Sequence, residues 1–292
     1  MSSGRTGDVR RGVLLSAGGM LILSPDGLML RLIQDAGLAD IVFYRSVFMS
    51  FTLVLVLLAL NRGDWKKPWR GFGRIGFFAC LLMTVSNITF VGAIAHTTVA
   101  NVLVILAAMP LFSALLGWLL IRERVKPRTW FAIMAALSGV VVIFAGSLSG
   151  GGWLGIGLAL ATAIVQGLTL VVLRYAKADV TIPALCLSGL LSGGVSLFYA
   201  SPYTVGQHDL TILALMGLLI VPVALALFLS GTRYIPAAEV ALFALLETVL
   251  GPLWVWLGVG EVPSAATWLG GAIVLSAIVL HSVLALKKPE AD

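Results

Sequence analysis

The chain has 292 residues, of which 60% are hydrophobic and only 11% are charged. A soluble domain of this length needs more charged surface, so the composition excludes a soluble globular protein. The formal net charge of +6 does not indicate nucleic acid binding, because most basic residues stand between apolar runs, where they act as topology signals. The two cysteines, Cys80 and Cys186, lie within apolar runs, which excludes a disulfide framework or a cysteine-based metal motif.

Apolar segments separated by turn residues follow one another along the whole chain. A helix needs about 20 residues to span the hydrocarbon core of a membrane, and each segment is close to that length. We therefore expect an all-α membrane protein with ten transmembrane helices. In chain order these are residues 12–32, 39–60, 71–93, 98–121, 127–146, 152–174, 181–200, 210–232, 237–258 and 264–286.

The basic residues predict the orientation of these helices. With ten crossings, nearly all of them fall on the side that holds both termini, and the other side holds at most Arg31 and Arg45. Cytoplasmic connections carry an excess of Lys and Arg, so we expect both termini in the cytoplasm and the protein in the cytoplasmic (inner) membrane. The residues on this side are Arg5, Arg10, Arg11, Arg62, Lys66, Lys67, Arg70, Arg74, Arg122, Arg124, Lys126, Arg128, Arg174, Lys177, Arg233, Lys287 and Lys288.

An internal repeat divides the chain into two halves, residues 1–148 and 149–292. Residues 97–143 align with residues 235–281 without a gap, and Glu123 then falls on Glu261. Five helices per half is an odd number, so the second half would be inverted relative to the first. Inverted repeats are a common plan for transporters, in which two halves enclose a site near the midplane. The alternative is a duplication that serves helix packing alone.

Two stretches resemble a known family. Residues 110–123 (Pro-x-x-x-Ala-Leu-Leu-Gly-Trp-Leu-Leu-Ile-Arg-Glu) are similar to the fourth-helix signature of the EamA branch of the drug/metabolite transporter superfamily. Residues 246–263, with Leu-Glu at the start and Gly-Glu-x-Pro at the end, resemble its ninth-helix counterpart. Tyr44-Arg45 in the second helix also suits that pattern.

The resemblance covers nearly the whole chain and implies ten helices in two inverted five-helix halves around a central cavity, and the export of metabolites. Thr248 stands where many members carry proline after the glutamate, and Gly251-Pro252 follows instead. That stretch is similar to the YddG-like members, which are associated with the export of aromatic amino acids.

Charged residues in the first two spans are candidates for gating or proton coupling. Asp26 follows Pro25, and a carboxylate inside a membrane costs several kcal/mol unless it is paired, hydrated or protonated. It belongs either to a gate hinge with a protonatable group or to the outer surface, if the helix begins later. Arg45 either holds a substrate carboxylate, or pairs with Asp40 or Asp26, or extends to the outer interface.

Glu247 is a candidate substrate-binding residue about ten residues into the expected helix 237–258. It could bind a substrate ammonium group or relay a proton. The alternative is a structural role beside unpaired backbone near Gly251 and Pro252. The matching position in the first half is Met109, which cannot ionise.

Three uncharged amides stand at mid-span, namely Asn87, Asn101 and Gln166. Amides offer both donors and acceptors, so they could bind the polar groups of an amino acid, or they could join helices to one another. Thr84 lies three residues before Asn87, on the same helical face, and we count it with the substrate-binding candidates.

The remaining candidates are aromatic or lie near span ends. Trp254, with Trp118 and Trp256, lies deep in its expected span and serves either core packing or an aromatic wall for an apolar substrate. Glu239 begins its helix, where an acid complements the helix dipole, so a structural role is expected. His281 ends the last helix and is expected to face lipid headgroups.

These features favour a transporter that works by alternating access on a small amphipathic metabolite, with the aromatic amino acids as the favoured substrates. The two halves would rock at prolines of four spans, Pro25, Pro110, Pro222 and Pro252. The alternatives are a channel and an intramembrane enzyme, but no catalytic constellation, metal motif or Walker lysine motif occurs. We therefore expect no enzymatic activity, cofactor, metal, nucleic acid or ATP site, and as partners only the substrate and the lipid bilayer.

Overall fold

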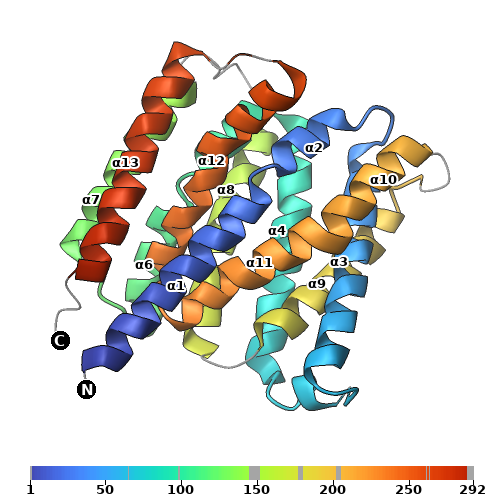
Figure 1. The fold of residues 1–292 in the computed structure, drawn as a ribbon. Coiled ribbons are helices and arrows are strands. Elements are labelled where there is room, and N and C mark those ends of the chain that lie inside the picture. The colour runs from blue at the N-terminus through green and yellow to red at the C-terminus, as the bar shows by residue number, and fades with distance from the viewer. Residues whose placement is uncertain are drawn as a thin grey trace.

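A computed structural model describes residues 2–64, 66–97, 99–144, 152–176, 180–201, 205–260, 262 and 264–287. Helices make up nearly all of these ranges, and no strand occurs within them. They stand roughly along one direction as a bundle, and the N- and C-termini emerge at the same end (Figure 1). We call this the terminal end and the other the opposite end.

The described residues of the N-terminal part of the bundle form seven α-helices and one short 3-10 helix. In chain order these are α1 (Ser2–Leu23), α2 (Asp26–Leu32), α3 (Leu38–Leu60), η1 (Lys67–Trp69), α4 (Gly73–His96), α5 (Val99–Leu106), α6 (Met109–Ile121) and α7 (Pro127–Phe144).

The C-terminal part continues in the same manner, with a π-helical segment, η3, and a 3-10 turn, η4. Its elements are α8 (Trp153–Ala176), α9 (Thr181–Leu197), α10 (Gln207–Leu215), η3 (Met216–Ile220), α11 (Val221–Ser230), η4 (Gly231–Arg233), α12 (Ala237–Val259) and α13 (Ala265–Lys287).

Eight helical segments within the described ranges are long and apolar enough to cross a membrane. They are residues 7–32, 38–60, 73–96, 101–121, 153–176, 207–233, 237–259 and 265–286, and each matches an expected span to within a few residues. The other two expected spans are the shorter apolar helices Pro127–Ile143 and Thr181–Leu197. The all-helical membrane class is therefore confirmed, whereas a total of ten crossings stays a prediction.

Three of the spans are interrupted next to a proline. The first span breaks between α1 and α2 at Pro25, the fourth between α5 and α6 just before Pro110, and the eighth passes through η3 just before Pro222. Proline lacks the backbone N–H and clashes with the preceding turn, which explains these breaks. Pro252 differs, because it lies inside the continuous helix α12.

Glycines let several helices approach closely, as their abundance predicts. Helices α7 and α13 run side by side (Figure 1), and a Cβ atom added to Gly139 of α7 would lie 2.7 Å from the carbonyl oxygen of Gly270 in α13. Gly189 and Gly193 of α9 meet α3 in the same way, where a Cβ atom on Gly193 would lie 3.0 Å from Val47. Small residues are the usual means of close packing in membranes.

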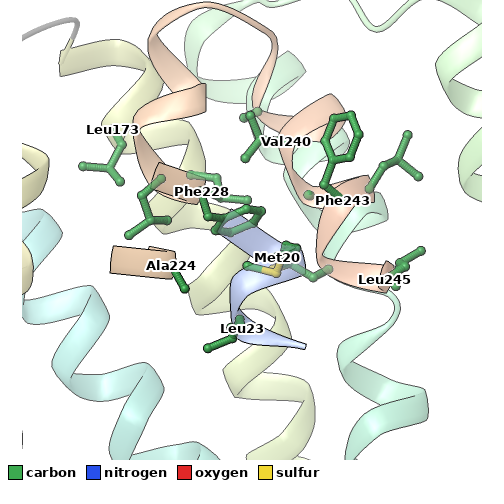
Figure 2. Packing of buried hydrophobic residues seen from close by; sticks show 14 of the residues in the cluster. Met20, Leu23, Leu173, Ala224, Phe228, Val240, Phe243 and Leu245 are labelled. Carbon is green, nitrogen blue, oxygen red and sulfur yellow. The ribbon is translucent and has the colours of Figure 1, made fainter. Parts of the chain in front are cut away.

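Helix α12 lies in the buried core of the bundle. Figure 2 shows apolar side chains from α1, α8, α11 and α12 gathered in one cluster. The labelled members are Met20, Leu23, Leu173, Ala224, Phe228, Val240, Phe243 and Leu245. Movement of α12 therefore requires these four helices to repack, since protein interiors are close-packed.

Candidate functional site

Asp26 begins α2, immediately after the break in the first span. Asp26 is only 5% exposed, and the Arg45 Nη2 atom donates a hydrogen bond to Asp26 Oδ1 at 3.1 Å. Helix α2 thus begins at Asp26, and the carboxylate is buried within the bundle. Of the alternatives for Arg45, the pairing with Asp26 is confirmed. Asp40 has another partner, since its Oδ1 atom accepts the backbone N–H of Ser201 at 2.7 Å.

Glu247 lies near the middle of α12, as expected, and its side chain is half-buried. It lies within electrostatic range of both Asp26 and Arg45. The carboxylates of Asp26 (α2) and Glu247 (α12) thus both lie near the guanidinium of Arg45 (α3). Glu247 itself makes no hydrogen bond or ion pair with any described residue.

Trp254 connects α12 to the break in the first span. Its Nε1–H donates a hydrogen bond to Ser24 Oγ at 2.8 Å, and Ser24 Oγ donates to the carbonyl oxygen of Leu21 at 2.8 Å. The hydroxyl of Ser24 thereby satisfies one carbonyl at the end of α1, where the helix stops. Trp254 therefore connects α12 to the break that precedes Asp26.

The mid-span amides differ in how they are satisfied. Asn87 Nδ2 donates to Ser46 Oγ of α3 at 3.4 Å, and Asn101 Nδ2 donates to Thr97 Oγ1 at 3.0 Å. Gln166 of α8 is half-buried and makes no hydrogen bond within the described ranges. Gln166 therefore resembles Glu247, because both hold polar groups at mid-span that no described protein atom satisfies.

Thr84 is buried in α4, and its hydroxyl donates to the carbonyl oxygen of Cys80 at 2.9 Å, one turn earlier in the same helix. This back-bonding to the i−4 carbonyl is common for threonine in helices. Thr84 thus shares a helical face with Asn87, as predicted, but its proton is directed to its own backbone.

A cluster of contacts that sequence reasoning missed joins three helices at the terminal end. Arg174 Nε, at the end of α8, donates to Glu123 Oε1 at 3.0 Å, and Arg174 Nη1 donates to the carbonyl oxygens of Thr232 and Arg233 at 3.1 Å each. Glu123 Oε2 accepts the N–H of Ala237, the first residue of α12, at 3.4 Å. We call these contacts the terminal clasp.

The only sequence signal for the terminal clasp is an acid directly after one apolar run and an arginine at the end of another. In the sequence, Arg174 is one of the basic residues that predict topology, and Glu123 is part of the internal repeat. Glu261, the counterpart of Glu123 in the repeat, lies outside the described residues.

The opposite end is held by a carboxylate as well. Both oxygens of Asp209, in the first turn of α10, accept backbone N–H groups from the connection between α2 and α3. The donors are Gln34, Asp35 and Ala36, at 3.1, 2.8 and 2.9 Å. The eighth span is thereby tied to the start of the second.

The prediction for His281 is wrong, and of the two alternatives for Trp118 the structure excludes core packing. His281 does not face headgroups, because it is 4% exposed and contacts Thr129 and Glu239 inside the bundle. Trp118 does not pack in the core, because 62% of its surface is exposed. In both cases a helical face points the other way from the one expected, and a uniformly apolar helix carries little periodicity from which its orientation can be read.

A helical bundle with an apolar exterior, broken helices and polar groups at mid-span defines a multi-pass membrane transporter. The chain belongs to the EamA-like transporter family, whose profile matches residues 10–145 and 153–283. This confirms the resemblance to the EamA branch of the drug/metabolite transporters. It also indicates a transporter rather than an enzyme.

Relatives with transporter names cover most of the chain. It is 26% identical over 239 residues to a riboflavin transporter of Rhizobium johnstonii, an alignment that covers 80% of this chain and 76% of that protein. It is 23% identical over 248 residues to the uncharacterized transporter YwfM of Bacillus subtilis, with 80% and 79% covered. A crystal structure that is 15% identical covers 95% of this chain and 99% of its own, with a TM-score of 0.82, and supports the fold.

Proposed function

We propose that this protein exports small amphipathic metabolites across the cytoplasmic membrane by alternating access. The observation that carries the proposal is that the side chains of Gln166 and Glu247 lack hydrogen-bond partners among the described residues. Each is a half-buried polar side chain at mid-span without a hydrogen bond to any described residue. Polar groups at membrane depth need a partner, and a bound ligand would supply it.

Two inverted five-helix halves would provide the alternation. The family profile matches the chain twice, over 10–145 and 153–283, which supports a division near residue 148. The two shorter apolar helices α7 and α9 would complete ten crossings, and an even number agrees with termini at one end of the bundle (Figure 1). The excess of basic residues in the connections on that side supports a cytoplasmic location for it.

The charges around Arg45 suit a zwitterion. An amino acid carries a carboxylate, which would compete with Asp26 for Arg45, and an ammonium group, which Glu247 would accept. Arg binds carboxylates in a fork geometry, so the exchange of one carboxylate for another preserves its hydrogen bonds. Gln166 would add a hydrogen bond to the polar end. Among amino acids we favour the aromatic ones, in keeping with the YddG-like stretch around Glu247 and Trp254.

A second substrate class comes from the relatives. The riboflavin transporter aligns over 80% of this chain, and riboflavin is also a planar aromatic molecule with polar groups. A flavin has no amino acid zwitterion, so it would use Gln166 more than the pair of Arg45 and Glu247. The two substrate classes therefore make different predictions for the variants of these residues.

The test is the release of radiolabelled phenylalanine, and separately of riboflavin, from preloaded liposomes that contain the purified full-length protein. We expect release of phenylalanine above protein-free liposomes. Glu247→Gln and Gln166→Leu should each slow it about tenfold or more, because a hydrogen bond to a charged group contributes about 1.5–3 kcal/mol. Gln207→Leu, at the exposed start of α10, is the matched control and should not change the rate.

Release of riboflavin alone, reduced by Gln166→Leu but not by Glu247→Gln, would move the substrate to the flavin class. Release of neither compound by correctly inserted protein would contradict an aromatic amphipathic substrate.

A further inference from the structure

Three polar side chains from three helices meet inside the terminal end of the bundle. Thr129 stands in the first turn of α7, Glu239 in the first turn of α12, and His281 near the end of α13. Their exposed fractions are 1%, 4% and 4%, so the cluster is closed to both water and lipid. Neither the transport mechanism nor the candidate substrate site uses these residues.

The hydroxyl of Thr129 lies between an acid and a base. Thr129 Oγ1 is 3.4 Å from Glu239 Oε1 and 3.1 Å from His281 Nε2, and the direct distance between Glu239 Oε1 and His281 Nε2 is 3.8 Å. A hydroxyl donates one hydrogen bond and can accept another at the same time. Thr129 can therefore link the carboxyl and the imidazole in either direction.

Both directions give a complete chain of hydrogen bonds. With the proton on the imidazole, His281 Nε2–H donates to Thr129, which donates to a Glu239 carboxylate. With the proton on the carboxyl, Glu239 donates to Thr129, which donates to His281 Nε2. The cluster can thus hold a proton on either the carboxyl or the imidazole with every hydrogen bond made. Hydrogen bonds in such a network strengthen one another where the dielectric constant is low.

The charged groups around the cluster come mainly from the start of α7 and the connection that precedes it. Arg128, Lys126 and Glu123 lie within electrostatic range of Glu239, and Arg128 also acts on His281. Glu123 is paired with Arg174 of α8, and Arg128 Nη1 donates to the carbonyl oxygen of Leu284 in α13 at 3.1 Å. Helix α1 also packs on α12 and α13, and its charged residues Asp8, Arg10 and Arg11 are exposed at the surface.

The cluster and the terminal clasp hold the same turn of α12. Ala237 donates its N–H to Glu123, and Glu239, two residues later, accepts from Thr129. Helix α12 also carries Glu247, about two turns further on. A displacement of α12 relative to α7 and α13 must therefore change the distances within the cluster. A ligand that binds one arrangement more tightly than another shifts the equilibrium between them, and a proton is such a ligand.

We propose that Thr129, Glu239 and His281 form a proton-binding site that couples movement of α12 to the proton gradient, at a distance from the substrate-binding residues. Its physiological role rests on the proposed transport function, whereas proton binding itself can be measured without a substrate. One proton adds to the Glu239 carboxylate, whose O–H then donates to Thr129, and the charge of the cluster rises by one. The proton enters from the aqueous phase at the terminal end when α12 moves, because the cluster is closed in the arrangement described here.

Proton binding is tested by infrared difference spectra of the full-length protein in lipid after a change of pH. We expect a protonated-carboxyl band that Glu239→Gln removes and that Thr129→Val and His281→Gln shift. Thr211→Val, at the exposed start of α10, is the matched control and should leave the band unchanged. His281→Asn serves as a second variant if Glu239→Gln does not fold. An identical band in wild type and in folded Glu239→Gln would overturn the site.

Coupling is tested in the same liposomes by measuring the rate of substrate release twice, once without a gradient and once with an imposed pH gradient. Glu239→Gln should retain release without a gradient, and the ratio of the rate with the gradient to the rate without it should fall to one. A ratio as high as that of wild type would overturn coupling at this site. If no substrate moves but the carboxyl band behaves as expected, the proton site stands and the proposed transport function fails.

Discussion

Arg45 stands between two carboxylates, because it pairs with Asp26 and lies within electrostatic range of Glu247. The side chains of the pair are 23% and 8% exposed, so water screens them only partly. Removing one partner of a buried pair leaves an uncompensated charge, which costs more than the pair contributes. The stability of the protein should therefore fall by different amounts when the Arg45 cation is removed and when one of the two carboxylates is neutralised.

We predict that Arg45→Leu destabilises the protein more than Asp26→Asn does. Loss of the guanidinium leaves the buried Asp26 carboxylate and the half-buried Glu247 carboxylate without a cation, and it should cost on the order of 3 kcal/mol. Loss of the Asp26 charge leaves Arg45 near Glu247 and should cost less. The measurement is unfolding of each variant in detergent, with Asp35→Asn and Arg70→Leu as exposed controls within about 0.5 kcal/mol of wild type. An Asp26→Asn variant less stable than Arg45→Leu would contradict this account.

At the scale of elements, glycines and prolines have separate effects. Prolines interrupt the first, fourth and eighth spans, whereas Gly139 and Gly270 let α7 and α13 approach until their backbones touch. The chain contains many glycines, and only some lie at such crossings. Gly157 of α8, for example, has no atom within 4 Å of the position of an added Cβ.

We predict opposite effects for the same substitution at two glycines. Gly139→Ala should destabilise the protein by about 1–3 kcal/mol, because its Cβ would overlap the backbone of α13, which cannot rotate away. Gly157→Ala should leave stability unchanged or raise it by up to about 1 kcal/mol, because alanine is the better helix former and meets open space. Thermal unfolding of the two variants side by side gives the comparison. Equal effects would mean that the crossing of α7 and α13 is looser than its geometry indicates.

At the scale of the whole molecule, carboxylates connect helices at both ends. Glu123 joins α6, α8 and α12 at the terminal end, and Asp209 ties α10 to the connection after α2 at the opposite end. Under the proposed alternating access each end opens in turn, so these contacts would break and re-form. The terminal clasp should therefore set how often the terminal end opens.

We predict that Glu123→Gln increases access to the interior from the terminal end. Ser113 of α6 is 1% exposed, so Ser113→Cys, in a background with Cys80→Ala and Cys186→Ala, reports on opening. If the clasp contributes about 1.4 kcal/mol, a water-soluble maleimide should label this cysteine about tenfold faster in Glu123→Gln. Asp64→Asn, an exposed acid in the connection after α3, is the control. Labelling that Glu123→Gln leaves unchanged would exclude a gating role for the terminal clasp.

The sequence alone determined the membrane class, the position of the helices and the family. Hydrophobic runs must reach about 20 residues to span a bilayer, and this requirement appears directly in the chain. The sequence also predicted hinges at four prolines. The helices are interrupted next to Pro25, Pro110 and Pro222, because proline acts through its own backbone, whereas α12 continues through Pro252. Asp26 and Glu247 were recognised as candidate acids within apolar runs, because a charge in such a run stands out wherever the run packs.

Which polar groups meet depends on how the helices pack against one another. The pairing of Glu123 with Arg174, and of Thr129 with Glu239 and His281, joins residues far apart in sequence. In a soluble helix the polar face indicates the outside, but in lipid both faces are apolar and periodicity does not distinguish them. The rotation of each helix about its own axis, which buried His281 and exposed Trp118, therefore depends on packing between helices, as at Gly139 and Gly270.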